Sequence, residues 1–482
     1  MSFSTLFNLL GFLNLILAGS MGLPLLVNWI YGEPHARGFL LSIAATALSG
    51  LLMMLIFKRS RRRDLTHREG FAIVAFGWII VSFFGALPYL LTGTLNSLVD
   101  AVFETVSGFT TTGSTVITNI EATSYAILFW RSLTQWLGGM GIILLSLAIL
   151  PFLGVGGMQL YKAEVPGPTA DKLRPRISQT ARILWEVYIL FSAAEVLTLL
   201  LGGMNLFDAL CHTFSTMATG GFSPKNESIE FYRSPFLEYS ITFFMFLAGA
   251  NFALHYRFLK GNVKVLWRDA EFCFYTSVVL LATLFISLNL WLSIQKEFFQ
   301  AFRLAIFQVV SILTTTGFTT ADFEKWPLFS QYLLLTLMFI GGCAGSTGGA
   351  IKCVRIYILL KQGFQELRKL IHPRAVLPVK LGGKVISPDT LSGIWGLFFL
   401  YLLIFSMASL ALSMLGSDIL TSISAVATTL GNVGPGLGTV GPTENFAHLS
   451  VAAKWILTFC MLLGRLEIYT LLVLLIPEFW KK

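Results

Sequence analysis

Apolar segments of about 20 residues recur along the whole chain, and this pattern constrains the fold more than any other feature. A helix needs about 20 apolar residues to cross a bilayer. Of the 482 residues, 55% are hydrophobic and only 12% are charged, whereas soluble domains carry about 25% charged residues. The sequence therefore predicts a membrane protein, surrounded by lipid. We expect ten spans, near residues 8–30, 38–57, 71–92, 126–152, 180–203, 236–257, 271–294, 329–360, 391–415 and 450–476.

Basic residues gather in every second connecting loop. Six of them lie between Lys58 and Arg68, after the second predicted span, and six more lie between Lys361 and Lys384, after the eighth. An excess of Lys and Arg marks cytoplasmic loops, so we expect both termini to face the cytoplasm of a bacterial inner membrane. The net charge of +9 then reflects membrane topology, and no nucleic-acid partner is expected.

The loops on the opposite side share one pattern. Each holds a short amphipathic helical stretch, too short to span a bilayer, followed by a tail rich in Thr and Gly. The unit of span, half-span, glycine-bearing return and span occurs four times, which indicates an internal repeat. The four stretches are DAVFETVSGFTTTGST (Asp100 to Thr115), DALCHTFSTMATGGFS (Asp208 to Ser223), LAIFQVVSILTTTGFT (Leu304 to Thr319) and DILTSISAVATTLGNVGPG (Asp418 to Gly436).

The spacing of residues within these stretches assigns one glycine to each return. Serines 107, 215 and 311 each precede a glycine by six residues, at positions 113, 221 and 317. The fourth return leaves two choices. Aligning Asp418 with Asp100 selects Gly431, whereas Thr428, six residues upstream, selects Gly434. We prefer Gly434, because the glycine ends the extended turn while the preceding helix can vary in length.

Four return loops of one kind suggest a ring of backbone carbonyls around a common axis. Irregular backbone at membrane depth is tolerated only where protein buries it or where it lines a water-filled path. Carbonyl rings can replace the hydration shell of a monovalent cation, and glycine permits the required backbone turn. The expected filter glycines are Gly113, Gly221, Gly317 and Gly434, and the expected carbonyl donors are Thr111, Thr112, Thr219, Gly220, Thr315, Thr316, Asn432 and Val433.

Residues 341–352, GGCAGSTGGAIK, interrupt the eighth predicted span. Glycine costs about 1 kcal/mol per residue in a helix interior, so this density of glycine predicts a break in the helix. Close helix packing through small residues is the alternative explanation. In the last span, Arg465 is an ionisable residue at membrane depth, which makes it a functional candidate; a local pair with Glu467 or snorkelling to the interface is the alternative.

The four loops, the GNVGPG turn at 431–436 and the GGCAGSTGGAIK stretch resemble the Trk/Ktr/HKT superfamily of potassium transporters, and most of all its bacterial Trk-type (TrkH-like) membrane subunits. The resemblance covers essentially the whole chain. It implies an all-α polytopic membrane protein with four pseudo-symmetric helix–pore-loop–helix repeats around one pore, plus an N-terminal helix pair. Glycine at all four filter positions is the pattern associated with potassium preference in that superfamily, so potassium is the expected transported ion.

The resemblance also implies a gate and partners. It assigns an intramembrane obstruction to the Gly-rich stretch, here Gly345, Ser346, Thr347, Gly348 and Gly349, and a pore-facing arginine to Arg465. It further implies a homodimer in membrane lipid that docks a cytosolic ring of nucleotide-binding, TrkA-like subunits. The basic loops 153–180 and 361–388 are the expected docking surface.

Two other functions are considered besides a gated pore. An alternating-access symporter coupled to protons or sodium is the alternative function, although four repeats of the same sense favour a gated pore. A membrane-embedded enzyme is a remote alternative, since no HExxH or GxSxG motif occurs.

The repeats predict how the chain is divided. The predicted units are an N-terminal two-helix segment at 1–69 and repeats at 70–153, 154–268, 269–388 and 389–482.

Overall fold

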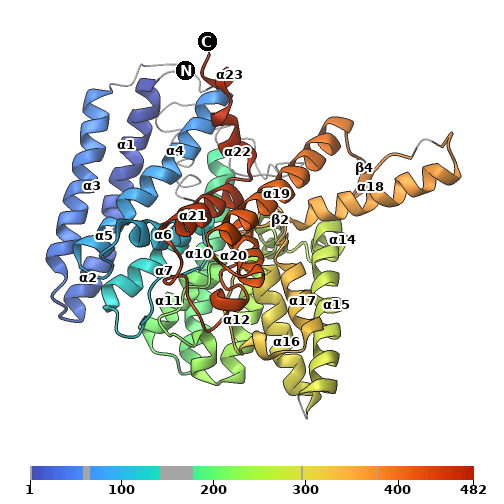
Figure 1. The fold of residues 1–482 in the computed structure, drawn as a ribbon, viewed down its shortest axis with the longest axis horizontal. Coiled ribbons are helices and arrows are strands. Elements are labelled where there is room, and N and C mark those ends of the chain that lie inside the picture. The colour runs from blue at the N-terminus through green and yellow to red at the C-terminus, as the bar shows by residue number, and fades with distance from the viewer. Residues whose placement is uncertain (1–2, 58–65, 142–176, 295–296, 376, 482) are drawn as a thin grey trace.

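The computed structural model describes residues 3–57, 66–141, 177–294, 297–375 and 377–481. Helices form almost all of the regular structure (Figure 1). The N-terminal helices pack along one edge, beside the first repeat. Their bounds are α1 Phe3–Ser20, α2 Gly22–Ile30 and α3 Ala36–Ile56.

Four repeats of one design follow, each with an outer helix, a shorter pore helix, a return segment and a second helix. Repeat 1 comprises α4 His67–Gly85, α5 Leu87–Leu91, α6 Leu98–Phe109 and α7 Tyr125–Met140. Repeat 2 comprises α10 Ile177–Leu201, α11 Leu206–Met217, the 3-10 helix η1 Ser228–Tyr232, α12 Pro235–Ala248, α13 Phe252–Leu259 and α14 Val265–Arg268.

Repeats 3 and 4 follow the same order, and two-stranded pairings add the only strands among the described residues. Repeat 3 comprises α15 Ala270–Ser293, α16 Phe298–Leu313, η2 Phe323–Lys325, α17 Leu328–Leu337, the parallel pair β1 Ile340–Gly341 and β2 Ile351–Lys352, α18 Cys353–Ile371, and the antiparallel pair β3 Lys380–Leu381 and β4 Lys384–Val385. Repeat 4 comprises α19 Pro388–Met414, α20 Ile419–Gly431, η3 Gly438–Val440, α21 Val451–Arg465, α22 Tyr469–Leu472, η4 Val473–Leu475 and α23 Pro477–Trp480.

The pore helices α6, α11, α16 and α20 have 12 to 16 residues, too few to cross a bilayer. Side chains cap three of their N-termini: Ser97, Asn205 and Asp418 each accept a hydrogen bond from a backbone N–H of the first turn. The hydrogen bonds that Asp418 receives from Thr421 hold the pKa of its carboxyl below its usual range. These caps fix the residue at which each of the three helices begins.

The long apolar spans agree with the sequence prediction at six places in the described part of the chain. Helical segments at Phe3–Ile30, Ala36–Ile56, Arg68–Leu91, Ala181–Leu201, Ala270–Ser293 and Pro388–Met414 are long and apolar enough to cross a membrane. The predicted span 126–152 appears as α7 up to Met140, and its remainder lies outside the described residues.

Two of the predicted spans are sharply bent in the structure. In place of the span 236–257, α12 and α13 meet at a bend of 102°, and in place of 450–476, α21 and the α22–η4 segment meet at 110°. Asn251 starts α13 by accepting a hydrogen bond from the Ala253 N–H at 2.8 Å. At the second bend Glu467 and Ile468 both have left-handed backbone, with φ of 52° and 58°. Apolar composition alone carried no sign of either bend.

The predicted break in the eighth span is confirmed, since α17 ends at Leu337 and α18 begins at Cys353. The Gly-rich segment between them forms the short parallel pair β1–β2 and turns inside the protein. Beyond it, α18 and the start of α19 project from the body of the molecule, with the β3–β4 hairpin between them (Figure 1). The second helix is therefore interrupted in repeats 2, 3 and 4.

Candidate pore and gate

All four pore helices end in the same hydrogen-bonded turn. The residue just before each candidate filter glycine donates its N–H to a carbonyl five residues earlier, as in the Schellman motif that closes many helices. The donor–acceptor pairs are Thr112 to Ser107, Gly220 to Ser215, Thr316 to Ser311 and Val433 to Thr428, each at 2.8 Å.

Each turn contains a left-handed residue two positions before its glycine. Thr111, Thr219, Thr315 and Asn432 have φ between 53° and 61°. Asparagine adopts this conformation readily, but threonine is β-branched and rarely does. Strain of this kind costs on the order of 1–3 kcal/mol per residue and persists where the surrounding structure enforces it, as at functional sites. The repetition of one strained conformation in three threonines indicates a common structural requirement.

The backbone also distinguishes the two candidate glycines of the fourth loop. Gly434 has φ of 111° and follows the left-handed Asn432 by two residues, as Gly113, Gly221 and Gly317, with φ of 75° to 86°, follow their threonines. Gly431 is the last residue of α20. Gly434 is thus the geometric counterpart of the other three glycines.

The four glycines contact one another's loops in a closed cycle. A Cβ atom added to Gly113 would lie less than 3.0 Å from the carbonyl oxygen of Gly220 in the second loop. The same holds for Gly221 against Thr316, for Gly317 against Val433, and for Gly434 against Thr112, which returns to the first loop. Real Cβ atoms essentially never approach so closely, so a side chain at any of these four positions would require the neighbouring loop to shift.

A second cycle of contacts joins the segments that follow the glycines. The Asn226 side chain accepts from the Ile120 N–H at 3.1 Å, and the Ile229 N–H donates to the Thr319 carbonyl at 3.1 Å. The Glu324 carboxylate accepts from the Gly438 N–H. The cycle closes where the Phe446 N–H donates to the Thr115 carbonyl at 2.9 Å. These links fix the loops as one ring.

A cavity of about 160 Å³ adjoins the ring. All four glycines line it, together with charged side chains that include Arg131, Lys225 and Glu444. Because both signs of charge occur, the cavity wall does not act as a purely cationic or anionic surface. Because all four glycines line it, we call this cavity the vestibule.

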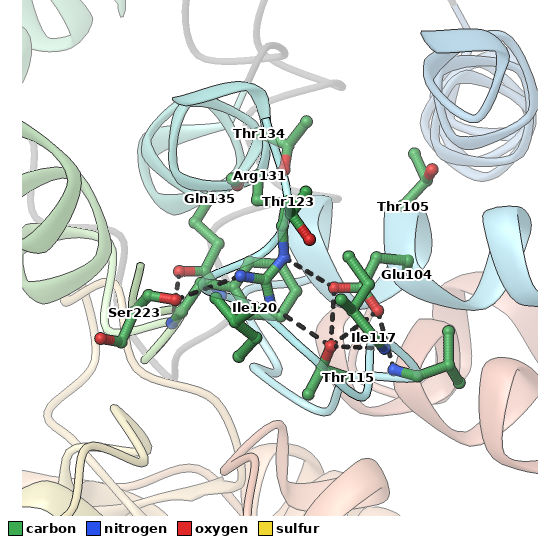
Figure 2. Close-up of polar contacts among 12 residues, drawn as sticks. Glu104, Thr105, Thr115, Ile117, Ile120, Thr123, Arg131, Thr134, Gln135 and Ser223 are labelled. Atoms are coloured by element: carbon green, nitrogen blue, oxygen red, sulfur yellow. Dashed lines mark hydrogen bonds and ion pairs between the residues drawn. The ribbon is translucent and has the colours of Figure 1, made fainter. Parts of the chain in front are cut away.

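Repeat 1 carries a buried ion pair that the sequence analysis missed. Glu104 of α6 and Arg131 of α7 are 2.8 Å apart and almost completely buried. Glu104 also accepts from the Val116 N–H at 2.9 Å, while Arg131 donates to the Ser223 carbonyl at 3.2 Å (Figure 2). The pair therefore ties the first return loop to the second. Charged residues inside a half-span and a full span were the available signal.

On the other side of the ring, the segment between β1 and β2 reaches three of the four pore helices. The Thr347 hydroxyl donates to the Met217 carbonyl at the end of α11, at 3.0 Å. The Gly349 N–H donates to the Thr315 hydroxyl at 2.7 Å. A Cβ atom on Gly349 would lie 2.6 Å from the Gly431 carbonyl. The Gly-rich segment thus packs directly beneath the helix ends that carry the left-handed residues.

Arg465 connects this segment to the remaining repeat. Its guanidinium donates to the Thr347 carbonyl at 2.7 Å and to the carbonyls of Gly138 and Gly139, at 2.7 and 3.1 Å, at the end of α7. Glu467, considered above as a possible partner of Arg465, forms an ion pair with Arg355 of α18. A second cation, Lys352, is buried beside the segment and donates to the Gly348 carbonyl.

These contacts define what the site can do chemically. The ring offers backbone carbonyls and hydroxyls, which are ligands suited to a monovalent cation. No group of three or more His, Cys, Asp or Glu side chains that could hold a metal ion occurs within the ranges that the structure describes. The cavity thus lies against the four glycines, and the Gly-rich segment packs against the ends of three pore helices.

Known proteins resemble the chain over its whole length. The TrkH family, described as cation transport proteins, matches residues 35–482. "Trk system potassium uptake protein TrkH" of Salmonella typhimurium is 45% identical, and that of Escherichia coli K12 is 44% identical, with 100% of each chain covered. The crystal structure of the potassium transporter TrkH from Vibrio parahaemolyticus superimposes with a TM-score of 0.90 at 40% identity, covering 100% of both chains.

Proposed function

The chain belongs to the TrkH family of cation transport proteins, and from this premise we propose that it carries potassium ions into the cell through a gated pore whose filter contains four glycines. Relatives that are 44–45% identical over the whole chain are named as potassium uptake proteins, which supports a multi-pass membrane transporter rather than an enzyme. The observation that carries the filter assignment is the closed cycle in which Gly113, Gly221, Gly317 and Gly434 each pack against a carbonyl of the next loop.

In this proposal the carbonyls before the glycines bind the permeating ion. The donors are those of residues 111, 112, 219, 220, 315, 316, 432 and 433. The pore helices end at the ring, so the negative ends of their dipoles favour a cation there. The common turn geometry supports Gly434 over Gly431 as the fourth filter glycine.

The Gly-rich segment and Arg465 serve as the gate. Residues 345–349 touch the ends of the pore helices of repeats 2, 3 and 4, and Arg465 links the segment to α7 of repeat 1. A segment held on all sides beneath the ring obstructs the path, and the positive charge of Arg465 raises the barrier for a cation. Opening then requires the segment to leave these contacts.

We further propose how the chain is divided into repeats, where it lies and which partners it binds. The repeats divide near 70–153, 154–268, 269–388 and 389–482, after an N-terminal pair at 1–69. The protein lies in the bacterial inner membrane as a homodimer with both termini in the cytoplasm, and TrkA-like nucleotide-binding subunits dock on loops 153–180 and 361–388. Most of the first loop lies outside the described residues, while the second includes the projecting end of α18.

The filter assignment is tested with Gly113→Ser and Gly434→Ser in liposomes. A side chain at either position meets backbone of the neighbouring loop, so we expect the potassium-to-sodium permeability ratio, measured from reversal potentials, to fall severalfold. Gly434 tolerates a Cβ best of the four, since the Thr112 oxygen would lie 2.9 Å away. Gly19→Ser, where nothing lies within 4 Å, is the control. An unchanged ratio in both folded variants would refute the filter.

A further inference from the structure

The second loop differs from the other three because one side chain forms two hydrogen bonds with its backbone. Gln135 of α7 is completely buried. Its Nε2 donates to the carbonyl oxygen of Gly220 at 2.6 Å, and its Oε1 accepts from the N–H of Phe222 at 3.0 Å. The amide therefore brackets Gly221 from both sides. Gln135 extends from the same helix as Arg131, toward the second loop (Figure 2).

Gln135 also explains why the second loop carries two glycines in succession. The residues before the filter glycine are Thr112, Thr316 and Val433 in the other loops, but Gly220 here. A Cβ atom on Gly220 would lie 2.5 Å from the Gln135 Cδ atom. The amide thus fills the space that a side chain occupies in the other three loops.

The other repeats have no amide at the corresponding position. Gly138 of repeat 1 and Gly464 of repeat 4 occupy equivalent positions. A Cβ atom on Gly138 would lie less than 3.0 Å from the Phe109 carbonyl oxygen, and one on Gly464 equally close to that of Leu430. Each of these carbonyls lies four residues before the filter glycine of its own repeat. Three residues before Gly138 and Gly464 stand Gln135 and Met461. Aligning the sequences FFMFLAG of repeat 2 and TLMFIGG of repeat 3 with FCMLLGR of repeat 4 puts Met245 and Met338 at the position of Met461, and all three methionines are buried. A thioether donates no hydrogen bond, so this position carries a donor in repeat 1 alone.

We propose that Gln135 is a specificity-determining residue of the pore, which acts by holding the Gly220 carbonyl. This inference rests on the filter proposed above. A carbonyl oxygen has two lone pairs, and the amide engages one of them, which restrains the oxygen at one corner of the ring. Selectivity depends on ring size and on the field of the carbonyls. A restrained oxygen cannot follow a smaller ion inward, so Gln135 disfavours sodium relative to potassium.

The direct test is Gln135→Met, which keeps the side-chain length and installs the residue of the other three repeats. In liposomes containing the purified full-length protein, we expect the potassium-to-sodium permeability ratio to fall about threefold or more, while potassium flux is retained. Leu133→Met, a volume-conserving change on the same helix, should leave the ratio unaltered. An unaltered ratio in Gln135→Met overturns the inference.

A double variant separates hydrogen bonding from packing. Gln135→Ala combined with Gly220→Ala places a methyl group in the vacated space but provides neither hydrogen bond. We expect its permeability ratio to stay low. Recovery of the full ratio would show that Gln135 only fills space, and would overturn the proposal.

Two further outcomes are decided by parallel measurements. If Gly113→Ser or Gly434→Ser changes the ratio and Gln135→Met does not, the filter stands and the role of Gln135 is wrong. If neither glycine variant nor Gln135→Met changes it, the filter itself is wrong. Should Gln135→Met fail to fold, Gln135→Leu is measured in the same assay. Failure of both to fold assigns Gln135 to folding rather than specificity and overturns the inference.

Discussion

Replacing Arg465 with alanine should open the pore. The guanidinium donates to the Thr347 carbonyl of the Gly-rich segment and to two carbonyls at the end of α7, so the substitution removes both a tether and a positive charge from the path. We expect potassium flux through purified protein, without any cytosolic partner, to increase about tenfold.

The magnitude follows from the charge. A unit charge 4 Å from a permeating ion raises its energy by about 4 kcal/mol at an effective dielectric constant of 20. Water entering the pore screens this, and a third of the value, about 1.3 kcal/mol, corresponds to roughly tenfold in rate. The loss of a charge-assisted hydrogen bond to Thr347, worth about 1.5–3 kcal/mol, acts in the same direction.

Arg465→Lys distinguishes the two contributions. Lysine keeps the charge but lacks the planar fork that reaches several carbonyls at once. If the charge dominates, flux through Arg465→Lys stays near that of the unaltered protein; if the tether dominates, it increases. Arg182→Ala, at an exposed ion pair near the start of α10, is the control for surface charge.

A deletion within 345–349 provides the comparison for the segment itself. It should also increase flux, and its effect should combine with Arg465→Ala less than additively, because segment and arginine form one barrier. The measurement is ion uptake into liposomes at matched protein content. A fall in flux through both single variants, with normal expression and unaltered ion selectivity, would refute the gate, since these residues would then hold the pore intact.

Two other predictions concern the ring and its support. Gly431→Ala should lower the melting temperature, because its Cβ would lie 2.7 Å from the Met338 carbonyl oxygen. Gly434→Ala should instead alter ion selectivity. If only Gly431→Ala changed the selectivity, the fourth filter position would move by three residues. Glu104→Gln should destabilise the protein by about 3–5 kcal/mol, because it leaves the buried Arg131 charge unpaired. Thermal unfolding in detergent measures this stability. The double variant Glu104→Gln with Arg131→Met should be more stable than Glu104→Gln alone, whereas purely additive effects would make it less stable.

Composition and repetition predicted the class of fold and the broken eighth span. Long apolar runs have few alternatives in lipid, and the glycines between Leu337 and Cys353 are incompatible with a stable helix interior. The resemblance to the Trk superfamily is confirmed by relatives that match the whole chain. These features depend on local composition, which a single sequence displays directly.

The bends and the buried polar contacts depended on tertiary structure. The turn at Glu467 and Ile468 has no glycine or proline to mark it, and the contacts of α22 with α4 and of Glu467 with Arg355 hold it in place. Gln135 is one amide in a helix, and its importance becomes apparent only when α7 lies against the second loop. The assignments of the filter carbonyls and of the gate remain predictions that the experiments above address.

The cycle of four loops within one polypeptide has a genetic consequence. In a channel assembled from four identical chains, every codon change appears at all four corners of the pore, as with the four identical loops of potassium channels. A change of about 0.5 kcal/mol per corner then amounts to about 2 kcal/mol, roughly thirtyfold in a rate. Here the same change is made once and shifts a rate only about twofold. Mutation can therefore adjust this pore one quarter at a time, and a pair such as Gln135 and Gly220 can arise at a single corner.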